Sequence, residues 1–155
     1  METLGYINER EILFQKHDVG INWSRNLPES NWLLAAFVEI DDTNILDEIA
    51  RKVIDKAVCY ACCIGAFGEK MHDMIDENLV IREVEIEKLH LPKHQVMTTW
   101  HKNISNGLWF AAFSAFHETG PIEKIYCLDI GKVSNKAEVL ELIDKFNKGF
   151  LPEDE

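Results

Sequence analysis

The chain has 155 residues, of which 46% are hydrophobic and 28% are charged, a composition typical of globular proteins. This length allows one hydrophobic core without disulfides or bound metal, so we expect a single domain over residues 1–155. The formal net charge of -11, from 16 basic and 27 acidic residues, repels phosphate backbones. Nucleic acid and anionic membranes are therefore not expected as partners.

The sequence has the features of a protein that stays inside the cell. No apolar run approaches the ~20 residues that a membrane-spanning helix needs. The N-terminal segment METLGYINERE carries acids where a secretory signal would carry bases and then an apolar stretch. We therefore expect a cytoplasmic protein without a membrane partner.

Residues 1–31 have a less regular pattern than the rest of the chain. We expect an irregular N-terminal wrap over the core, in which EILFQK is a candidate edge strand and Trp23 anchors a loop. From residue 32 to residue 150, short apolar runs alternate with amphipathic stretches. The first run, WLLAAFVEI (Trp32–Ile40), is apolar on both faces until Glu39, as in a strand that is covered on both sides.

The next segments repeat this pattern. Asp41 and Asp42 offer caps for an amphipathic helix, and VCYACCIGA (Val58–Ala66) then predicts a second buried strand. A second helix follows, and residues 79–95 after it are ambiguous. The alternation of Val84 and Ile86 there indicates an exposed edge strand or an extended connection.

The last part of the chain predicts two more strands and two more helices. The third strand is centred on residues 95–99 and leads through residues 100–103 into an aromatic helix that ends at Gly120-Pro121. A fourth strand covers residues 122–130, and a final helix begins near Asn135. This alternation predicts an α/β fold: a Rossmann-like three-layer sandwich with about four parallel strands, helices on both faces and an additional edge strand.

The four cysteines include a C-x-x-C spacing, which on pattern alone suggests zinc or thiol redox chemistry. Their apolar surroundings and the absence of a second pair favour buried thiols that act as small hydrophobic groups. On a strand, Cys59 and Cys62 would point to opposite faces, where they could not share one metal ion. We therefore predict no metal site, and no cofactor can be named from the sequence.

Ligands of open parallel sheets bind outside the carboxyl ends of the strands, near a switch in strand order. His101 follows the third strand, and its ordinary pKa near ~6.5 suits acid or base catalysis at neutral pH. Nearby carboxylates would favour its charged form. The candidate catalytic residues are His101, His72 and Asp73, and the candidate ligand-binding residues are Asp41, Asp42, Glu69, Thr99 and Trp100.

Each candidate also has a purely structural explanation. Asp41 and Asp42 suit the capping of a helix as well as the binding of a cation. Glu69 and His72 share a helix face with Asp76, which is either a surface for a divalent metal or the solvated side of an amphipathic helix. No glycine-rich phosphate loop or nucleophile elbow is present, so the sequence matches no catalytic template.

The aromatic helix offers a different kind of site. Its large apolar residues lie on most sides, which indicates either deep burial or contact with a second surface. In a domain of this size one side of the helix should face solvent, where an aromatic patch would mark an interface. The candidate interface residues are Trp109, Phe110 and Phe113.

Two short motifs carry a resemblance. GAFGEKMHD (Gly65–Asp73) has the form G-x-x-x-E-x-x-H-D, and TTWH (Thr98–His101) follows it. Together they resemble an uncharacterised bacterial family of small α/β proteins, over about 120 residues from Trp32 onward. The family has no assigned activity. The resemblance implies that His72, Asp73, Trp100 and His101 belong to one pattern.

Two functions remain open at this point. The first is an acidic accessory module that binds another copy of itself or a basic protein, as toxin-immunity or defence-system accessory proteins do. It is favoured by the charge of -11 and by the aromatic helix. The alternative is a small enzyme or ligand-binding domain that uses His101 and His72 with nearby carboxylates. The two histidines would then have to converge on one pocket.

Overall fold

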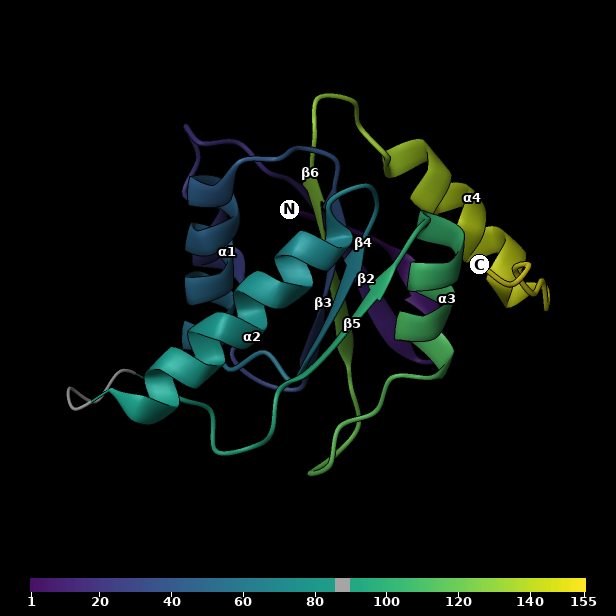
Figure 1. Cartoon of the computed structure of the whole chain (residues 1–155). Helices are drawn as coiled ribbons and strands as arrows, with labels where there is room; N and C mark the ends of the chain where they lie inside the picture. The colour runs from purple at the N-terminus through teal and green to yellow at the C-terminus, as the bar shows by residue number, and fades with distance from the viewer. Residues whose placement is uncertain (86–89) are drawn as a thin grey trace.

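The computed structural model describes residues 1–85 and 90–155, which form a six-stranded sheet (Figure 1). The strand order is β1-β2-β6-β3-β4-β5, where only β1 runs antiparallel to its neighbour. This confirms a mixed α/β protein with a mostly parallel sheet. The strands are β1 (Glu2–Ile7), β2 (Arg10–Lys16), β3 (Trp32–Val38), β4 (Tyr60–Ile64), β5 (Met97–His101) and β6 (Lys124–Ile130).

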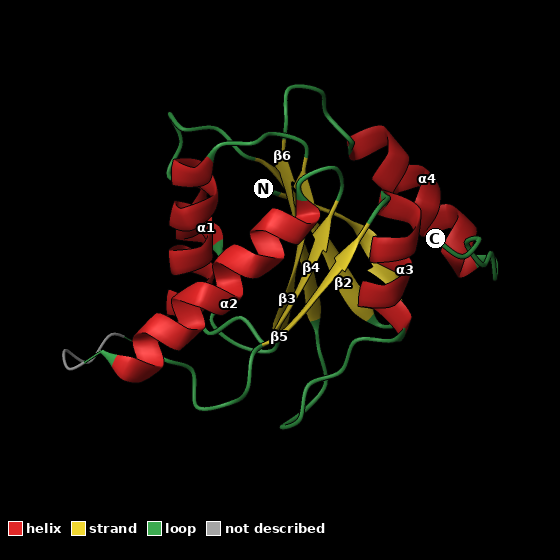
Figure 2. Cartoon of the chain, in the orientation of Figure 1, coloured by secondary structure: helices red, strands yellow, loops and turns green. Residues whose placement is uncertain are grey.

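Helices cover the sheet on both sides (Figure 2). On one face lie α1 (Thr43–Asp55) and α2 (Gly68–Val84), and on the other lie α3 (Ile104–Phe113) and α4 (Lys136–Asn147). A short 3-10 helix, η1 (Trp23–Asn26), adds the buried Trp23 to the core on the α1 side. No helix in the described part of the chain is both long and apolar enough to cross a bilayer.

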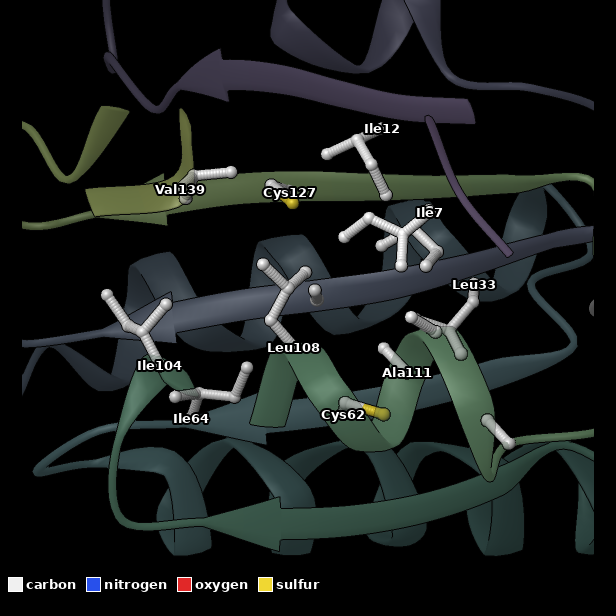
Figure 3. Packing of buried hydrophobic residues seen from close by; sticks show 14 of the residues in the cluster. Ile7, Ile12, Leu33, Cys62, Ile64, Ile104, Leu108, Ala111, Cys127 and Val139 are labelled. Carbon is white, nitrogen blue, oxygen red and sulfur yellow. The ribbon is translucent and has the colours of Figure 1, made fainter. Parts of the chain in front are cut away.

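The central strands are apolar on both faces because each face is covered by helices. All seven residues of β3 are buried, and their side chains divide between two hydrophobic clusters on opposite faces of the sheet. Figure 3 shows the α3 side, where Leu108 and Ala111 of the helix pack against Leu33 and Cys62 of the strands. The sheet therefore separates two distinct cores.

The N-terminal segment is more regular than expected. Residues 1–16 form a hairpin of β1 and β2 that turns at Asn8 and Glu9, both with positive φ (51° and 63°), as in a two-residue hairpin turn. EILFQK is not an edge strand, because β2 lies between β1 and β6 and pairs with β6 in parallel. The irregular wrap was wrong for residues 1–16, and the predicted strand number was too small, because β2 pairs with a strand more than 100 residues later in the chain. Residues 17–31 contain only η1, in which Trp23 is buried.

The hairpin also supports α3. The guanidinium of Arg10 donates to the carbonyl oxygen of Ala115 at 2.8 Å, and Asn8 Nδ2 donates to that of Ala112 at 2.9 Å. Ala112 lies in the last turn of α3, where carbonyl groups have no partner within the helix, and Ala115 lies just beyond that turn. The N-terminal segment thus fixes the end of the aromatic helix.

The first part of the ambiguous segment, residues 79–84, belongs to the helix α2. The expected extended structure is wrong for residues 79–84, because α2 continues to Val84. Arg82 stabilises this extension, since its side chain is only 5% exposed and donates to Asp55 Oδ1 at 2.7 Å. Ile86, on which the predicted alternation also rested, lies outside the described residues.

Candidate functional site

His101 is the last residue of β5, which forms an edge of the sheet. It pairs with Ile64 of β4, and both side chains lie on the α3 face. The imidazole packs on the ring of Phe110 at a centroid distance of 5.1 Å, and its Nε2 lies 3.0 Å from the hydroxyl of Thr99. Thr99 and His101, two of the candidate residues, therefore lie side by side.

A cavity of about 460 Å³ opens beside His101. Its walls come from the end of β5, from α3 and from the C-terminal tail, which we define as residues 151–155. The lining residues are His101, Asn106, Trp109, Phe110, Leu151, Pro152, Asp154 and Glu155. Two of the predicted interface residues, Trp109 and Phe110, thus line the same cavity as the predicted catalytic histidine.

The C-terminal tail is held to the end of β5. Glu155 Oε1 accepts a hydrogen bond from the backbone N–H of Lys102 at 2.9 Å and lies 3.9 Å from Nδ1 of His101. Burial lowers the pKa of His101, while the Glu155 carboxylate raises it by a smaller amount. The imidazole is therefore mainly neutral at pH 7, whereas nearby carboxylates had been expected to favour its charged form.

His72 lies on the opposite face of the sheet. It belongs to α2, where Nδ1 is 3.0 Å from Asp73 Oδ1 and Nε2 is 3.6 Å from Asp76 Oδ2. Asp76 in turn accepts a hydrogen bond from the hydroxyl of Thr98, whose side chain points to the α2 side of β5. The two predicted histidines do not converge, because β5 separates their side chains.

Trp100 points away from the His101 cavity as well. Its neighbour in register is Cys63, which belongs to the cluster on the α1 and α2 side. The side chain is 44% exposed and does not line that cavity. Of the TTWH motif, Thr99 and His101 face one side of the sheet, and Thr98 and Trp100 face the other.

The acidic candidates after the first strand have structural roles. Asp42 caps α1, since its carboxylate accepts from the backbone N–H groups of Asn44 (3.1 Å) and Ile45 (3.2 Å). Asp41 forms an ion pair with Lys70, which also donates to the hydroxyl of Thr43 at 2.8 Å. These contacts join α1 to α2. Both acids therefore have a structural role, Asp42 as a helix cap and Asp41 as the partner of Lys70.

Glu69 and Asp73 line a separate hollow of about 480 Å³ over the first turns of α2. A further hollow of about 400 Å³ lies between the ends of β3 and β6, where the following connections pass to opposite faces. Near it the buried Asp129 is satisfied by Asn135, through its backbone N–H and its side chain, both at 2.8 Å. The switch in strand order therefore lies between the inner strands β3 and β6, and His101 lies elsewhere, at the β5 edge.

The cysteines are buried thiols, as expected. Burial raises the pKa of Cys59 to about 11 and that of Cys62 to about 12, so both stay protonated at neutral pH. The expected opposite orientation of these two was wrong, because Cys59 precedes β4 and both belong to the α3-side cluster. Within residues 1–85 and 90–155, no three His, Cys, Asp or Glu side chains gather as a metal site requires.

The aromatic helix places its predicted interface residues at different depths. Phe110 packs inward against Tyr60 at a centroid distance of 5.8 Å, whereas Phe113 is 40% exposed. Trp109 is partly buried, like Phe110, and contacts Phe113 at a centroid distance of 5.4 Å. Sequence reasoning missed the C-terminal tail, because its position over His101 has no local pattern.

Comparison with known proteins gives one finding. Residues 13–146 match the family described as Domain of unknown function (DUF7684), and this range contains both motifs. No curated protein and no solved structure was found to match the chain. The match confirms the resemblance to an uncharacterised family without an assigned activity. Because it covers most of the sequence, the chain belongs to the DUF7684 family.

Proposed function

We propose that this protein is a binding module for a basic protein partner and that it docks through an aromatic surface. This surface consists of Phe113 at the end of α3, Phe116 three residues later, and Phe150 and Leu151 after α4. The single observation that carries the proposal is their joint exposure: 40%, 66%, 43% and 69%, in that order. Large exposed apolar groups that lie close together mark interaction sites, and shared contacts with Phe146 bring Phe113 and Phe150 together.

Ring contacts hold the aromatic surface in place. Phe113 contacts the buried Phe146 at a centroid distance of 6.3 Å, and Phe146 stacks with Phe150 at 6.2 Å. A preordered aromatic group loses little side-chain entropy on binding, which is why such residues contribute most at interfaces. The surface therefore has the physical properties of a docking site that is formed before the partner arrives.

Charge indicates the chemistry of the partner. The net charge is -11, and the cavity beside the aromatic surface carries Asp154 and Glu155 next to Trp109. The carboxylates suit ion pairs with arginine or lysine side chains, and the aromatic walls of the cavity suit a neighbouring apolar side chain. A partner with basic residues next to apolar ones fits both features. A toxin-immunity or defence-system accessory role in the cytoplasm is one instance of such a function.

The enzyme alternative required His101 and His72 in one pocket. Their side chains lie on opposite faces of β5, so this pair cannot act together. Of the site that this alternative required, only the cavity beside His101 is present. In the present proposal this cavity receives a side chain of the partner.

A defined peptide tests the proposal. The probe is a fluorescein-labelled amphipathic helix of leucine and lysine, about 18 residues long, which offers apolar and basic faces together. Binding is measured by anisotropy for the unchanged chain, for Phe116→Ser and for the control Val133→Ser, whose side chain is 78% exposed on another loop. We expect Phe116→Ser to weaken binding about tenfold or more and Val133→Ser to leave it unchanged.

Two outcomes would contradict the proposal. Equal binding by Phe116→Ser and Val133→Ser would mean that charge alone attracts the peptide. A concentration-dependent dimer in sedimentation velocity that Phe116→Ser dissociates would assign the aromatic surface to a second copy of the chain.

A further inference from the structure

The β5 strand leaves one edge of the sheet open. In the described part of the chain its only strand neighbour is β4. Met97 donates its backbone N–H to the carbonyl oxygen of Cys59 at 3.4 Å, and the carbonyl oxygen of His101 accepts from Gly65 at 2.9 Å. Backbone groups of successive strand residues point in alternate directions. Thr98 and Trp100 therefore direct their N–H and C=O groups toward the open edge.

This edge carries none of the usual protection. Exposed edge strands are commonly guarded by lysine, proline or a bulge, which prevents pairing with another chain. The residues of β5 are MTTWH, and its pairing with β4 is regular along its whole length. Met97 and Trp100 are 38% and 44% exposed. The backbone of β5 is thus accessible and straight enough to accept another strand.

Carboxylates from three parts of the chain border β5. Glu118 accepts a hydrogen bond from the backbone N–H of Gln95 at 2.9 Å, just before the strand begins. Asp76 of α2 accepts from the hydroxyl of Thr98 at 2.8 Å in the middle of the strand. Glu155 of the C-terminal tail accepts from Lys102 at 2.9 Å, directly after the strand. Carboxylates therefore lie near the start, the middle and the end of β5.

The two sides of this edge differ in chemistry. Toward α2 lie Asp76 and, beside it on the same helix, the 63% exposed Asp73. Toward α3 lies the cavity of about 460 Å³, whose apolar walls include Trp109 and Phe110. Side chains of an added strand alternate between the two sides. A segment in which basic and apolar residues alternate matches both.

We propose that β5 binds an extended segment of a protein partner by strand addition, and that this segment alternates basic with apolar residues. The backbone groups of Thr98 and Trp100 supply the hydrogen bonds, the acids of α2 bind the basic side chains, and the cavity holds an apolar one. The inference goes beyond the proposed function, because it needs the β5 edge and not the exposed aromatic surface.

The test uses the full chain and a fluorescein-labelled peptide of alternating lysine and valine, about eight residues long. The control peptide has the same sequence with N-methyl groups on alternate residues, so it keeps the charge and loses the backbone donors. Trp100→Pro removes an outward N–H, as edge strands tolerate, and Trp100→Ala removes only the side chain. We expect Trp100→Pro to weaken binding about tenfold relative to Trp100→Ala, and the methylated peptide to bind correspondingly less.

Hydrogen exchange gives a readout that does not depend on the variants. In the unchanged chain, saturating peptide should slow exchange at the amides of Thr98 and Trp100. Unchanged exchange there, no binding, or equal binding of the methylated peptide would overturn the proposal. A dimer of the unchanged chain that Trp100→Pro abolishes would overturn it as well, because the strand would then come from a second copy. Loss of binding by Phe116→Ser alone would concern only the aromatic surface.

Discussion

The two edge strands of this sheet are closed to very different degrees. At β1, the register shifts between Thr3 and Gly5, and Glu2 pairs with Lys136 of α4 at 2.6 Å. Ile7, the last residue of β1, is fully buried in the α3-side core. At β5, pairing is regular and no lysine is present within the strand.

The difference shows which edge serves stability and which is free for another task. A bulge, a charge and a covering helix each prevent an edge from pairing with a foreign strand. The β1 edge has all three, since α4 packs against it. The β5 edge also has a helix, α2, packed against it, but it has neither a bulge nor a lysine within the strand, and acidic groups lie around it. The bulge and the ion pair at one edge make their absence at the other informative.

The largest expected effect is on stability at the closed edge. Ile7→Ala should lower the free energy of unfolding by ~2–5 kcal/mol, because it leaves a cavity in a close-packed core. Trp100→Ala at the open edge should cost less than ~1 kcal/mol, since its side chain is largely in water. Urea denaturation followed by circular dichroism measures both. Equal losses would show that the two edges contribute alike and would remove the contrast.

The sequence predicts those parts of the fold that have a local cause. The strand β3 is an unbroken apolar run, and α1 begins at Asp42 with a helix-capping residue. By contrast, β2 lies in the sheet interior because it pairs with β6, whose residues come more than 100 positions later in the chain. Long-range pairing of this kind leaves no periodic signal near residue 12.

The candidate site was predictable to a similar degree. The position of His101 at a strand end followed from the pattern of apolar runs. Its separation from His72 did not, because a shift of one residue in strand register exchanges the two faces of the sheet. The neutral state of His101 follows from its burial against Phe110, and Glu155, which comes from the far end of the chain, opposes it by a smaller amount. Only the folded chain brings these groups together.

A second experiment concerns the helix layer next to the open edge. A Cβ at Gly107 of α3 would overlap the buried side chain of Ile64 and would lie 3.4 Å from the Cβ of His101. Gly107→Ala should therefore lower the free energy of unfolding by ~1–3 kcal/mol, although alanine favours a helix by ~1 kcal/mol. Thermal denaturation measures the change, with Ser105→Ala on the same helix as the control. A stabilised Gly107→Ala would mean that α3 can move away from β4 and β5 without cost.

The smallest expected effect is a pH dependence of the free energy of unfolding, which arises at the β5 edge and not at the β1 edge. Burial lowers the folded-state pKa of His101, so the unfolded chain binds its proton more readily. Because the unfolded state then holds more protons, the free energy of unfolding should fall as pH drops from about 7 to about 5. His17 and His117 are shifted in the same direction by burial and contribute to this slope. His101→Gln should reduce the slope, and urea denaturation at several pH values measures it.

Two variants make this last comparison decisive. Glu155→Gln removes the carboxylate that raises the pKa of His101, so it should steepen the loss of stability below pH 7. The strand β1 contains no histidine, so the loss caused by Ile7→Ala should be the same at pH 5 and pH 7. If Ile7→Ala instead altered the slope as much as His101→Gln, the titrating group would not belong to the open edge. The pH dependence would then report on the whole core, and the histidine at the end of β5 would have no separate influence.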